Sequence, residues 1–358
     1  MNPRDEIKQL WRECFDDSSE FVDMFFSRVY RDDDALLLKS AGSLVSAMLL
    51  QGYTLSYHGS DTPMAYVCGA ATRRQYRGQG HMSALMREAL CEAHRRGDTF
   101  CALIPAHSWL YAYYSRFGFA PVFLVNDDRY TALHPFSVAG DFHPVDNLFD
   151  ERVYEAFSRL ERLVPCRVLH THRDFLNILD DIRIDGGAVA VMADSGRDGR
   201  IVSMAFGVSD GDTVRVTDVL GESHEACVAA LRQLRGSFAD LPFNVPVLPR
   251  DGAGVSTRRS LTPRGMMRIV NAGACIAAIA AANPQWRSVI RVTDPIVTDN
   301  SHIYVVARGQ MTVDDACAVL PDFDVPVDVL TRMAFSSPRI GEVMRFPAVR
   351  PQMTLMLD

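Results

Sequence analysis

The sequence lacks paired cysteines, basic blocks and long apolar runs, and each absence excludes a class of protein. The eight cysteines are dispersed with no C-x-x-C pair, so neither a disulfide framework nor a structural zinc site is expected. The net charge is −7 and basic residues form no block, so a nucleic acid is not an expected partner. Because there is no apolar run of about eighteen residues and no signal-type N-terminus, we expect a cytoplasmic protein with no membrane partner.

The sequence gives little support for a metal site. His170 and His172 form an H-T-H pair that could face one way on a strand, but no cysteine or carboxylate cluster accompanies them. Protein zinc sites usually combine three or four such ligands. We therefore expect surface histidines and no metal cofactor.

The composition predicts several compact domains. The chain has 358 residues, of which 48% are hydrophobic and 23% are charged. This length exceeds the size at which one hydrophobic core keeps growing, and the apolar content suits soluble cores rather than disorder. Two or three domains are expected.

Hydrophobic periodicity predicts a mixed α/β chain. Two amphipathic helices are expected over residues 4–15 and 18–30, then antiparallel strands over 35–39, 44–57 and 64–72. A helix from Met82 to a C-cap at Gly97 follows, and then a strand over 99–105, a short aromatic helix and a strand over 120–125. Residues 151–250 repeat this alternation of helix and strand, and a third mixed unit is expected to begin with a strand over 266–270.

The stretch between the third strand and the long helix carries the most specific pattern. It reads A-A-T-R-R-Q-Y-R-G-Q-G-H from Ala70 to His81 and contains Q-x-x-G-x-G. Gly78 and Gly80 would let the backbone approach a pyrophosphate, with successive N–H groups directed at its oxygens. The helix N-terminus adds a partial positive charge, and Arg77 or Arg74 can add a full one.

A glycine pattern this short also occurs in ordinary surface turns. Here the strand before it, the helix after it and the basic residues within it all favour a phosphate site. A Walker loop would need Gly-Lys-Ser/Thr, and a Rossmann loop would open a βαβ repeat. The antiparallel strands expected upstream argue against both.

In this context the segment resembles motif A of the GNAT N-acetyltransferases. Further along, Y-S-R-F-G-F from Tyr114 to Phe119 resembles the Tyr-x-x-x-Gly-Phe motif of the same family. The layout is similar to that of the Eis (enhanced intracellular survival) acetyltransferases, in which two GNAT-like domains precede a domain similar to sterol carrier proteins. The resemblance implies an α/β fold with a catalytic domain over 1–148, a second GNAT-like domain over 149–262 and a sterol-carrier-like domain over 263–358.

The second domain departs from the cofactor-binding pattern. Its corresponding junction reads D-V-L-G-E-S-H-E from Asp218 to Glu225, with one glycine and carboxylates where an anion would lie. Coulomb repulsion and the missing second glycine oppose pyrophosphate binding. One coenzyme A per chain is therefore expected.

The resemblance also implies roles for particular residues. Acetyl-CoA would be held by the motif A segment, at Ala70, Ala71, Thr72, Arg77, Gly78, Gln79, Gly80 and His81. Tyr114 matches the general-acid tyrosine of the family, although Tyr111 and Tyr113 are near enough to be the donor instead. In Eis-like enzymes the base is the C-terminal carboxylate, and the C-terminal residue here is Asp358. Whether its terminal or its side-chain carboxylate acts stays open. The alternative is a packed C-terminal segment that takes no part in catalysis.

The implied activity is transfer of the acetyl group of acetyl-CoA to a primary amine. Aminoglycosides, polyamines and lysine side chains are compatible acceptors. Acidic and aromatic residues of the first two expected helices could attract and stack a cationic amine, although a solvated acidic face explains them equally well; they are Asp16, Asp17, Glu20, Phe21 and Phe25. The alternatives are a lipid- or acyl-binding protein that uses the third domain, and a homo-oligomer in which other chains complete the site.

Overall fold

The computed structural model describes residues 2–238, 240–247 and 261–357. It has a mixed α/β fold, as the periodicity predicts, and divides into two compact units. Unit 1 combines Met1–Phe123 with Pro263–Gln352, and unit 2 combines Leu124–Thr262 with Met353–Leu357. The division into three domains stays a prediction.

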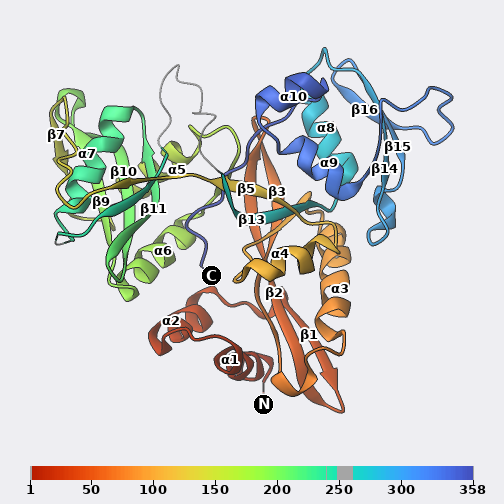
Figure 1. The fold of residues 1–358 in the computed structure, drawn as a ribbon, viewed down its shortest axis with the longest axis horizontal. Helices are drawn as coiled ribbons and strands as arrows, with labels where there is room; N and C mark the ends of the chain where they lie inside the picture. The colour runs from red at the N-terminus through yellow and green to blue at the C-terminus, as the bar shows by residue number, and fades with distance from the viewer. Residues whose placement is uncertain (1, 239, 248–260, 358) are drawn as a thin grey trace. The chain divides into compact units, whose positions relative to one another are not determined.

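The N-terminal part of unit 1 follows the expected order (Figure 1). Its elements are α1 (Pro3–Cys14), α2 (Ser19–Met24), β1 (Ala35–Ser40), β2 (Ser43–Tyr57), β3 (Ser60–Thr72), α3 (His81–Arg96), β4 (Phe100–Leu103), α4 (Ser108–Ser115) and β5 (Ala120–Val125). A side chain caps the N-terminus of each of the first two helices. The Asn2 side chain accepts a hydrogen bond from the Asp5 N–H, and the Ser18 side chain accepts one from the Phe21 N–H. The second helical run covers nearly the expected range, and its last part, Phe25–Val29, is a π-helical turn.

The C-terminal part of unit 1 adds a second sheet. Its elements are β13 (Thr262–Ile269), α8 (Ala272–Ala282), β14 (Ser288–Thr293), β15 (Ile303–Ala307), β16 (Gln310–Val313), β17 (Phe323–Pro326), α9 (Val327–Ala334) and α10 (Pro338–Met344). Strands β14 to β17 form their own sheet in the order β16-β15-β14-β17.

Strand β13 lies in the sheet of the N-terminal part of unit 1. It was expected to open the third unit, yet it pairs antiparallel with β4 and completes the order β1-β2-β3-β4-β13-β5. The apolar run around Met266 and Met267 is consistent with either sheet, since both residues are fully buried. Periodicity reports burial and not the partner strand.

The middle of unit 2 resembles the start of unit 1, with two helices, a run of three strands, a helix and a strand. Its elements are β6 (Asp127–Tyr130), β7 (Phe142–Pro144), α5 (Glu151–Glu161), β8 (Arg167–Leu169), α6 (His172–Ile184), β9 (Ala188–Asp194), β10 (Arg200–Asp210), β11 (Thr213–Gly221), α7 (His224–Arg235) and β12 (Phe243–Pro246). Its main sheet has the order β6-β12-β11-β10-β9-β7. As in unit 1, a long antiparallel hairpin lies at the centre, here β10 and β11.

The H-T-H pair does not lie on one strand. His170 is buried after β8 and pairs with Glu161, with 2.7 Å between Nδ1 and Oε1, so the expectation of two surface histidines is wrong for His170. Thr171 caps α6, and His172 begins that helix and stacks on Tyr154. The two rings therefore serve separate packing roles.

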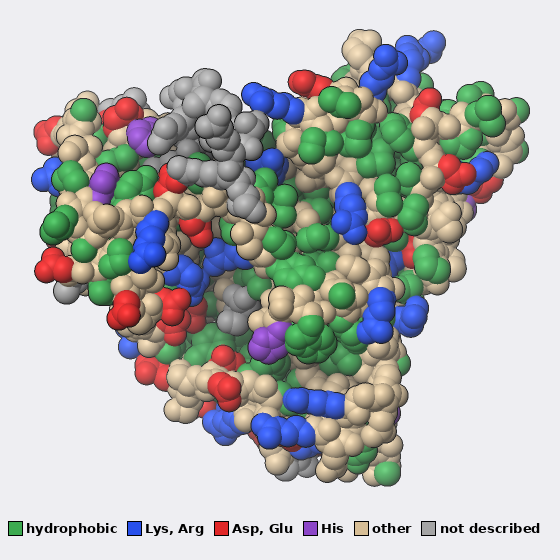
Figure 2. All heavy atoms as spheres, in the orientation of Figure 1, with side chains coloured by type: hydrophobic (Ala, Val, Ile, Leu, Met, Phe, Trp, Pro, Cys, Tyr) green, Lys and Arg blue, Asp and Glu red, His purple; other side chains and the backbone are tan. Residues whose placement is uncertain are grey.

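The surface carries mixed charges. Basic and acidic side chains are interspersed over the face drawn in Figure 2. Within the described part of the chain, no helix combines the length and hydropathy that a membrane span requires.

Candidate active site

Strand β3 contains a β-bulge at the start of the motif A segment. Ala47 of β2 lies opposite Ala71 and Leu49 lies opposite Cys68, so Gly69 and the residue after it share one partner position. Gly69 has a φ of +59°, and a Cβ added there would overlap the ring of Trp11. Glycine is therefore required at the bulge, which the sequence motif did not include.

Strands β3 and β4 separate beside this bulge. Their parallel register ends at Tyr66 and Ala102, whereas β3 continues to Thr72 and Leu103 of β4 lies opposite Met266 of β13. Among the described strands, none pairs with this side of β3 beyond Tyr66. The N–H and C=O groups there can therefore pair with an extended ligand.

The loop over residues 73–80 is fixed to helix α1 at its start. The Arg73 guanidinium donates to Glu13 Oε2 (2.8 Å) and to the Leu44 carbonyl oxygen (2.8 Å), and the Arg74 N–H donates to Glu13 Oε1 (3.1 Å). Glu13 was not among the predicted site residues, because it lies far from the motif in sequence. Its contacts hold the loop in one conformation, which lowers the entropy lost when a ligand binds.

Gly78 and Gly80 form an open cradle at the N-terminus of α3. Both adopt left-handed conformations, with φ of +76° and +83°, and no atom lies within 4 Å of a Cβ built on either. Gly80 is the N-cap residue and provides no side chain for the N–H groups of the first turn. Open space, free N–H donors and the helix dipole together make an anion site, so these residues fit the pyrophosphate of coenzyme A.

The remaining loop residues predicted to bind the cofactor contact their own neighbours. Arg77 Nε donates to the Thr72 carbonyl oxygen at 3.0 Å, and Gln79 Nε2 donates to the Gln75 carbonyl oxygen at 3.1 Å. The His81 ring lies 6.1 Å from the Tyr76 ring. The exposed Arg77 guanidinium still places a positive charge at the end of β3.

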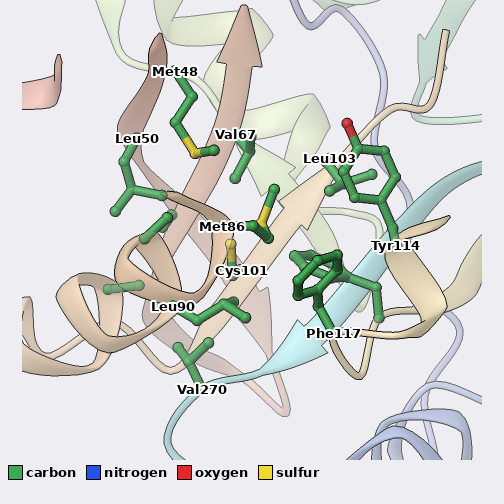
Figure 3. Close-up of a cluster of buried hydrophobic side chains, with 14 of the residues drawn as sticks. Met48, Leu50, Val67, Met86, Leu90, Cys101, Leu103, Tyr114, Phe117 and Val270 are labelled. Carbon is green, nitrogen blue, oxygen red and sulfur yellow. The ribbon is translucent and has the colours of Figure 1, made fainter. Parts of the chain in front are cut away.

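Tyr114 lies on α4 within the main hydrophobic cluster of unit 1. Its side chain is only 8% exposed and packs with apolar residues that include Met86 and Leu103. Figure 3 shows the ring beside Leu103, with the hydroxyl pointing away from Phe117. Burial raises the pKa of Tyr114 to about 12, so the phenol is protonated at neutral pH and available as a donor.

The two neighbouring tyrosines have hydroxyls that are already engaged. Tyr111 Oη donates to the Pro263 carbonyl oxygen at 2.8 Å, and Tyr113 Oη lies 3.2 Å from Ser83 Oγ. Among the described residues, none forms a hydrogen bond with the Tyr114 hydroxyl. Of the three candidates, Tyr114 alone has a hydroxyl that is free to meet a ligand.

The turn after Tyr114 is supported by a buried ion pair. The Arg268 guanidinium of β13 donates to the Phe117 carbonyl oxygen and to both carboxylate oxygens of Asp294, at 2.6 and 2.5 Å. Arg268 and Asp294 are almost fully buried. Gly118 has a φ of +82°, and a Cβ there would come within 3.1 Å of Val327 Cγ1. These long-range contacts explain why the motif has glycine at position 118, which the sequence alone does not show.

The aromatic residues expected to stack an amine are occupied. Phe21 and Phe25 are buried, and the Phe25 ring lies 4.8 Å from the ring of Trp11. Asp17 Oδ2 accepts a hydrogen bond from Trp11 Nε1 at 2.6 Å. Phe21 and Phe25 therefore belong to the core, which favours the alternative of an ordinary amphipathic helix for these two residues.

The predicted base, Asp358, lies outside the described residues. The segment before it, Met353–Leu357, belongs to unit 2 and is mostly buried. Burial agrees with the apolar character of this segment.

Sequence comparison assigns the N-terminal part of the chain to a known domain. Residues 3–122 match the family model described as "Acetyltransferase (GNAT) domain", which covers about a third of the chain. The chain therefore contains a GNAT acetyltransferase domain, and this domain supports acyl transfer as the class of chemistry. No curated relative matches the chain.

Solved structures share the fold over nearly the whole chain. A GCN5-related N-acetyltransferase from Anabaena variabilis aligns with a TM-score of 0.76 and 14% identity, covering 98% of this chain and 96% of that one. A conserved protein of unknown function from Enterococcus faecalis gives 0.74 and 16%, covering 96% and 90%. Eis1 from Mycobacterium abscessus gives 0.72 and 15%, covering 99% and 97%. These identities show a common fold.

Proposed function

We propose that this protein transfers the acetyl group of acetyl-CoA to a primary amine by direct attack of the amine. The observation that carries the proposal is the open N-terminus of α3, where Gly78 and Gly80 leave space and N–H donors for a diphosphate. The separation of β3 from β4 provides an adjacent strand edge for the extended part of the ligand. Acetyl-CoA supplies an acetyl group activated as a thioester.

Three groups of residues would hold the ligand. The backbone of Ala70, Ala71 and Thr72 binds and orients the pantetheine arm, because this part of β3 has an unpaired edge. The N–H groups of Gly78 to His81 bind the diphosphate. Arg77, fixed at the end of β3 by the Thr72 carbonyl, lowers the cost of concentrating negative charge there.

Tyr114 is the proposed general acid. It holds a proton on Oη at neutral pH, because burial raises its pKa to about 12. Transfer of that proton to the departing sulfur would let coenzyme A leave as a neutral thiol.

The carboxylate of Asp358 is the proposed proton acceptor for the attacking amine. An amine attacks only as the free base, so a group that takes its proton contributes directly to turnover. Aminoglycosides, polyamines and lysine side chains remain the candidate acceptors. In this proposal the segment over 263–358 is a sterol-carrier-like scaffold.

The experiment is a measurement of CoA release by the full chain with a panel of amines, alongside a fluorescent fatty-acid binding assay. Acetyl-CoA-dependent release with at least one amine is expected. Tyr114→Phe should lower kcat with little change in acetyl-CoA affinity, whereas the matched variant Tyr113→Phe should retain turnover. If the protein binds fatty acid and releases no CoA with any amine of the panel, it is instead a lipid-binding protein.

A further inference from the structure

The central hairpins of the two units each have a bulge in their second strand. In unit 2, Phe206 lies opposite Asp218 and Gly207 lies opposite Val216, so β11 carries one extra residue at Thr217. In unit 1 the bulge of β3 ends immediately before Ala71. Asp218 therefore directly follows the bulge in unit 2, as Ala71 does in unit 1.

The strand next to this position separates in both units. The parallel register of β11 with β12 covers only Val214 and Arg215, just as the register of β3 with β4 ends at Tyr66. Beyond Arg215, β11 therefore has an edge equivalent to the one that binds cofactor in the proposed function.

The described junction between β11 and α7 nevertheless has no cradle for phosphate in unit 2. Glu222 and Ser223 alone connect β11 to α7, in place of the glycine loop over residues 73–80. Ser223 Oγ accepts a hydrogen bond from the Ala226 N–H at 3.2 Å. A side chain therefore already takes an N–H donor in the first turn of α7, whereas the N-cap residue of α3, Gly80, has no side chain that could do so. Glu222 adds a negative charge, which two arginines, Arg159 and Arg200, already pair.

The C-terminal segment occupies this part of unit 2. Thr354 Oγ1 donates to Asp218 Oδ2 at 2.9 Å and accepts from Arg167 Nη2 at 2.7 Å. Leu355 packs against the cluster of α5, α6, β10 and β11 side chains, and Met353, Met356 and Leu357 are buried. Thr354 thus gives the segment a polar contact with buried charges, within apolar packing.

The charges that bind Thr354 are themselves buried and connected. Arg167 is 1% exposed and forms ion pairs with Asp218 and with Glu161. Glu161 also accepts a hydrogen bond from the His170 backbone N–H. A buried charge that loses one hydrogen-bond partner destabilises the structure more than an exposed one. The Thr354 hydroxyl is therefore an energetically significant part of this network.

We propose that unit 2 is the docking site of the chain's own C-terminal segment, which takes the strand position that holds cofactor in unit 1, and that Thr354 is a positioning residue for Asp358. This proposal rests on the proposed function for the role of Asp358. It explains why a GNAT-like repeat without a phosphate cradle keeps the bulge and the separated strands: they receive protein in place of coenzyme A.

The test compares three variants of the full chain. Thr354→Val removes the hydroxyl and keeps the shape, and Thr354→Ser keeps the hydroxyl. Thr213→Val is the matched control, because its Oγ1 donates to the Asp210 carbonyl oxygen at the β10–β11 turn and does not take part in the network around Asp218. Hydrogen exchange of the backbone amides of Met353–Leu357 reports docking without reference to activity.

Thr354→Val should exchange these amides at least about tenfold faster than wild type, since two hydrogen bonds to buried charges are lost. Its kcat should fall while the KM for acetyl-CoA is unchanged, and Thr354→Ser should restore both properties. Unchanged exchange would overturn the docking claim, and faster exchange with wild-type kcat would overturn the positioning claim. If wild type acetylates no amine, the proposed function and the positioning role fail together, while exchange still decides docking.

Discussion

The variant Gly80→Ala separates ligand binding from folding at the proposed phosphate cradle. Gly80 has a φ of +83° with open space where a Cβ would lie, so alanine meets no atom of the protein and only left-handed strain remains. That strain costs about 1–2 kcal/mol. Gly59, in the β2–β3 turn, has a φ of +79° and equally open surroundings. Gly59→Ala is therefore a control with the same strain.

The effect on binding should be much larger at Gly80 than at Gly59. A methyl group at Gly80 points into the space proposed for the diphosphate and displaces its oxygens from the N–H groups of α3. Two charge-assisted hydrogen bonds lost at about 1.5 kcal/mol each give about 3 kcal/mol, which is roughly a hundredfold in affinity. Both variants should lose about the same stability, a few degrees in Tm.

Calorimetric titration with coenzyme A and thermal denaturation of both variants provide the measurement. Weaker binding confined to Gly80→Ala would support the cradle. Wild-type affinity in Gly80→Ala, with the expected loss of stability, would refute it. An equal loss of affinity in Gly59→Ala would show that general backbone strain, and not contact with the diphosphate, reduces binding.

Three further predictions concern unit 1. Gly69→Ala should lower the free energy of unfolding by about 2–4 kcal/mol, because alanine adds left-handed strain and overlaps Trp11; denaturant titration measures this, and adding Trp11→Leu should recover part of the loss. Burial raises the pKa of Asp98 to about 6, so wild type loses stability as the pH rises from about 4 to 6. Asp98→Asn removes this charge and should therefore stabilise the protein by about 2–3 kcal/mol above pH 7. Equal stabilities of that pair at pH 8 would contradict this cause. Arg268→Met should cost about 3–5 kcal/mol, since it leaves the Asp294 charge buried without its partner, and the double replacement with Asp294→Leu should cost less.

Much of the fold follows from local sequence patterns. The sequence predicts helix α3 and its end at Gly97 from a period of three to four and a C-cap glycine. It predicts β2 and β3 as antiparallel strands from their apolar runs. The partner of β13 could not be predicted, for a physical reason. A buried strand shows the same apolar run in any sheet, and its partner is chosen by contacts far away in sequence.

The candidate site was predictable only where its residues are contiguous. The glycines of the loop and Tyr114 lie in short motifs, and their spacing carries the chemistry. Glu13, Arg268 and Trp11 act through side-chain contacts across long sequence separations, so no motif contains them. Gly69 gave one usable indication, because a glycine inside a strand often marks a bulge.

A crystal structure of the wild-type chain with coenzyme A tests the central claim most directly. The account predicts one ligand per chain, with its diphosphate on the N–H groups of Gly78 to His81 and its sulfur near the Tyr114 hydroxyl. A diphosphate bound elsewhere, or a ligand in unit 2, would contradict it.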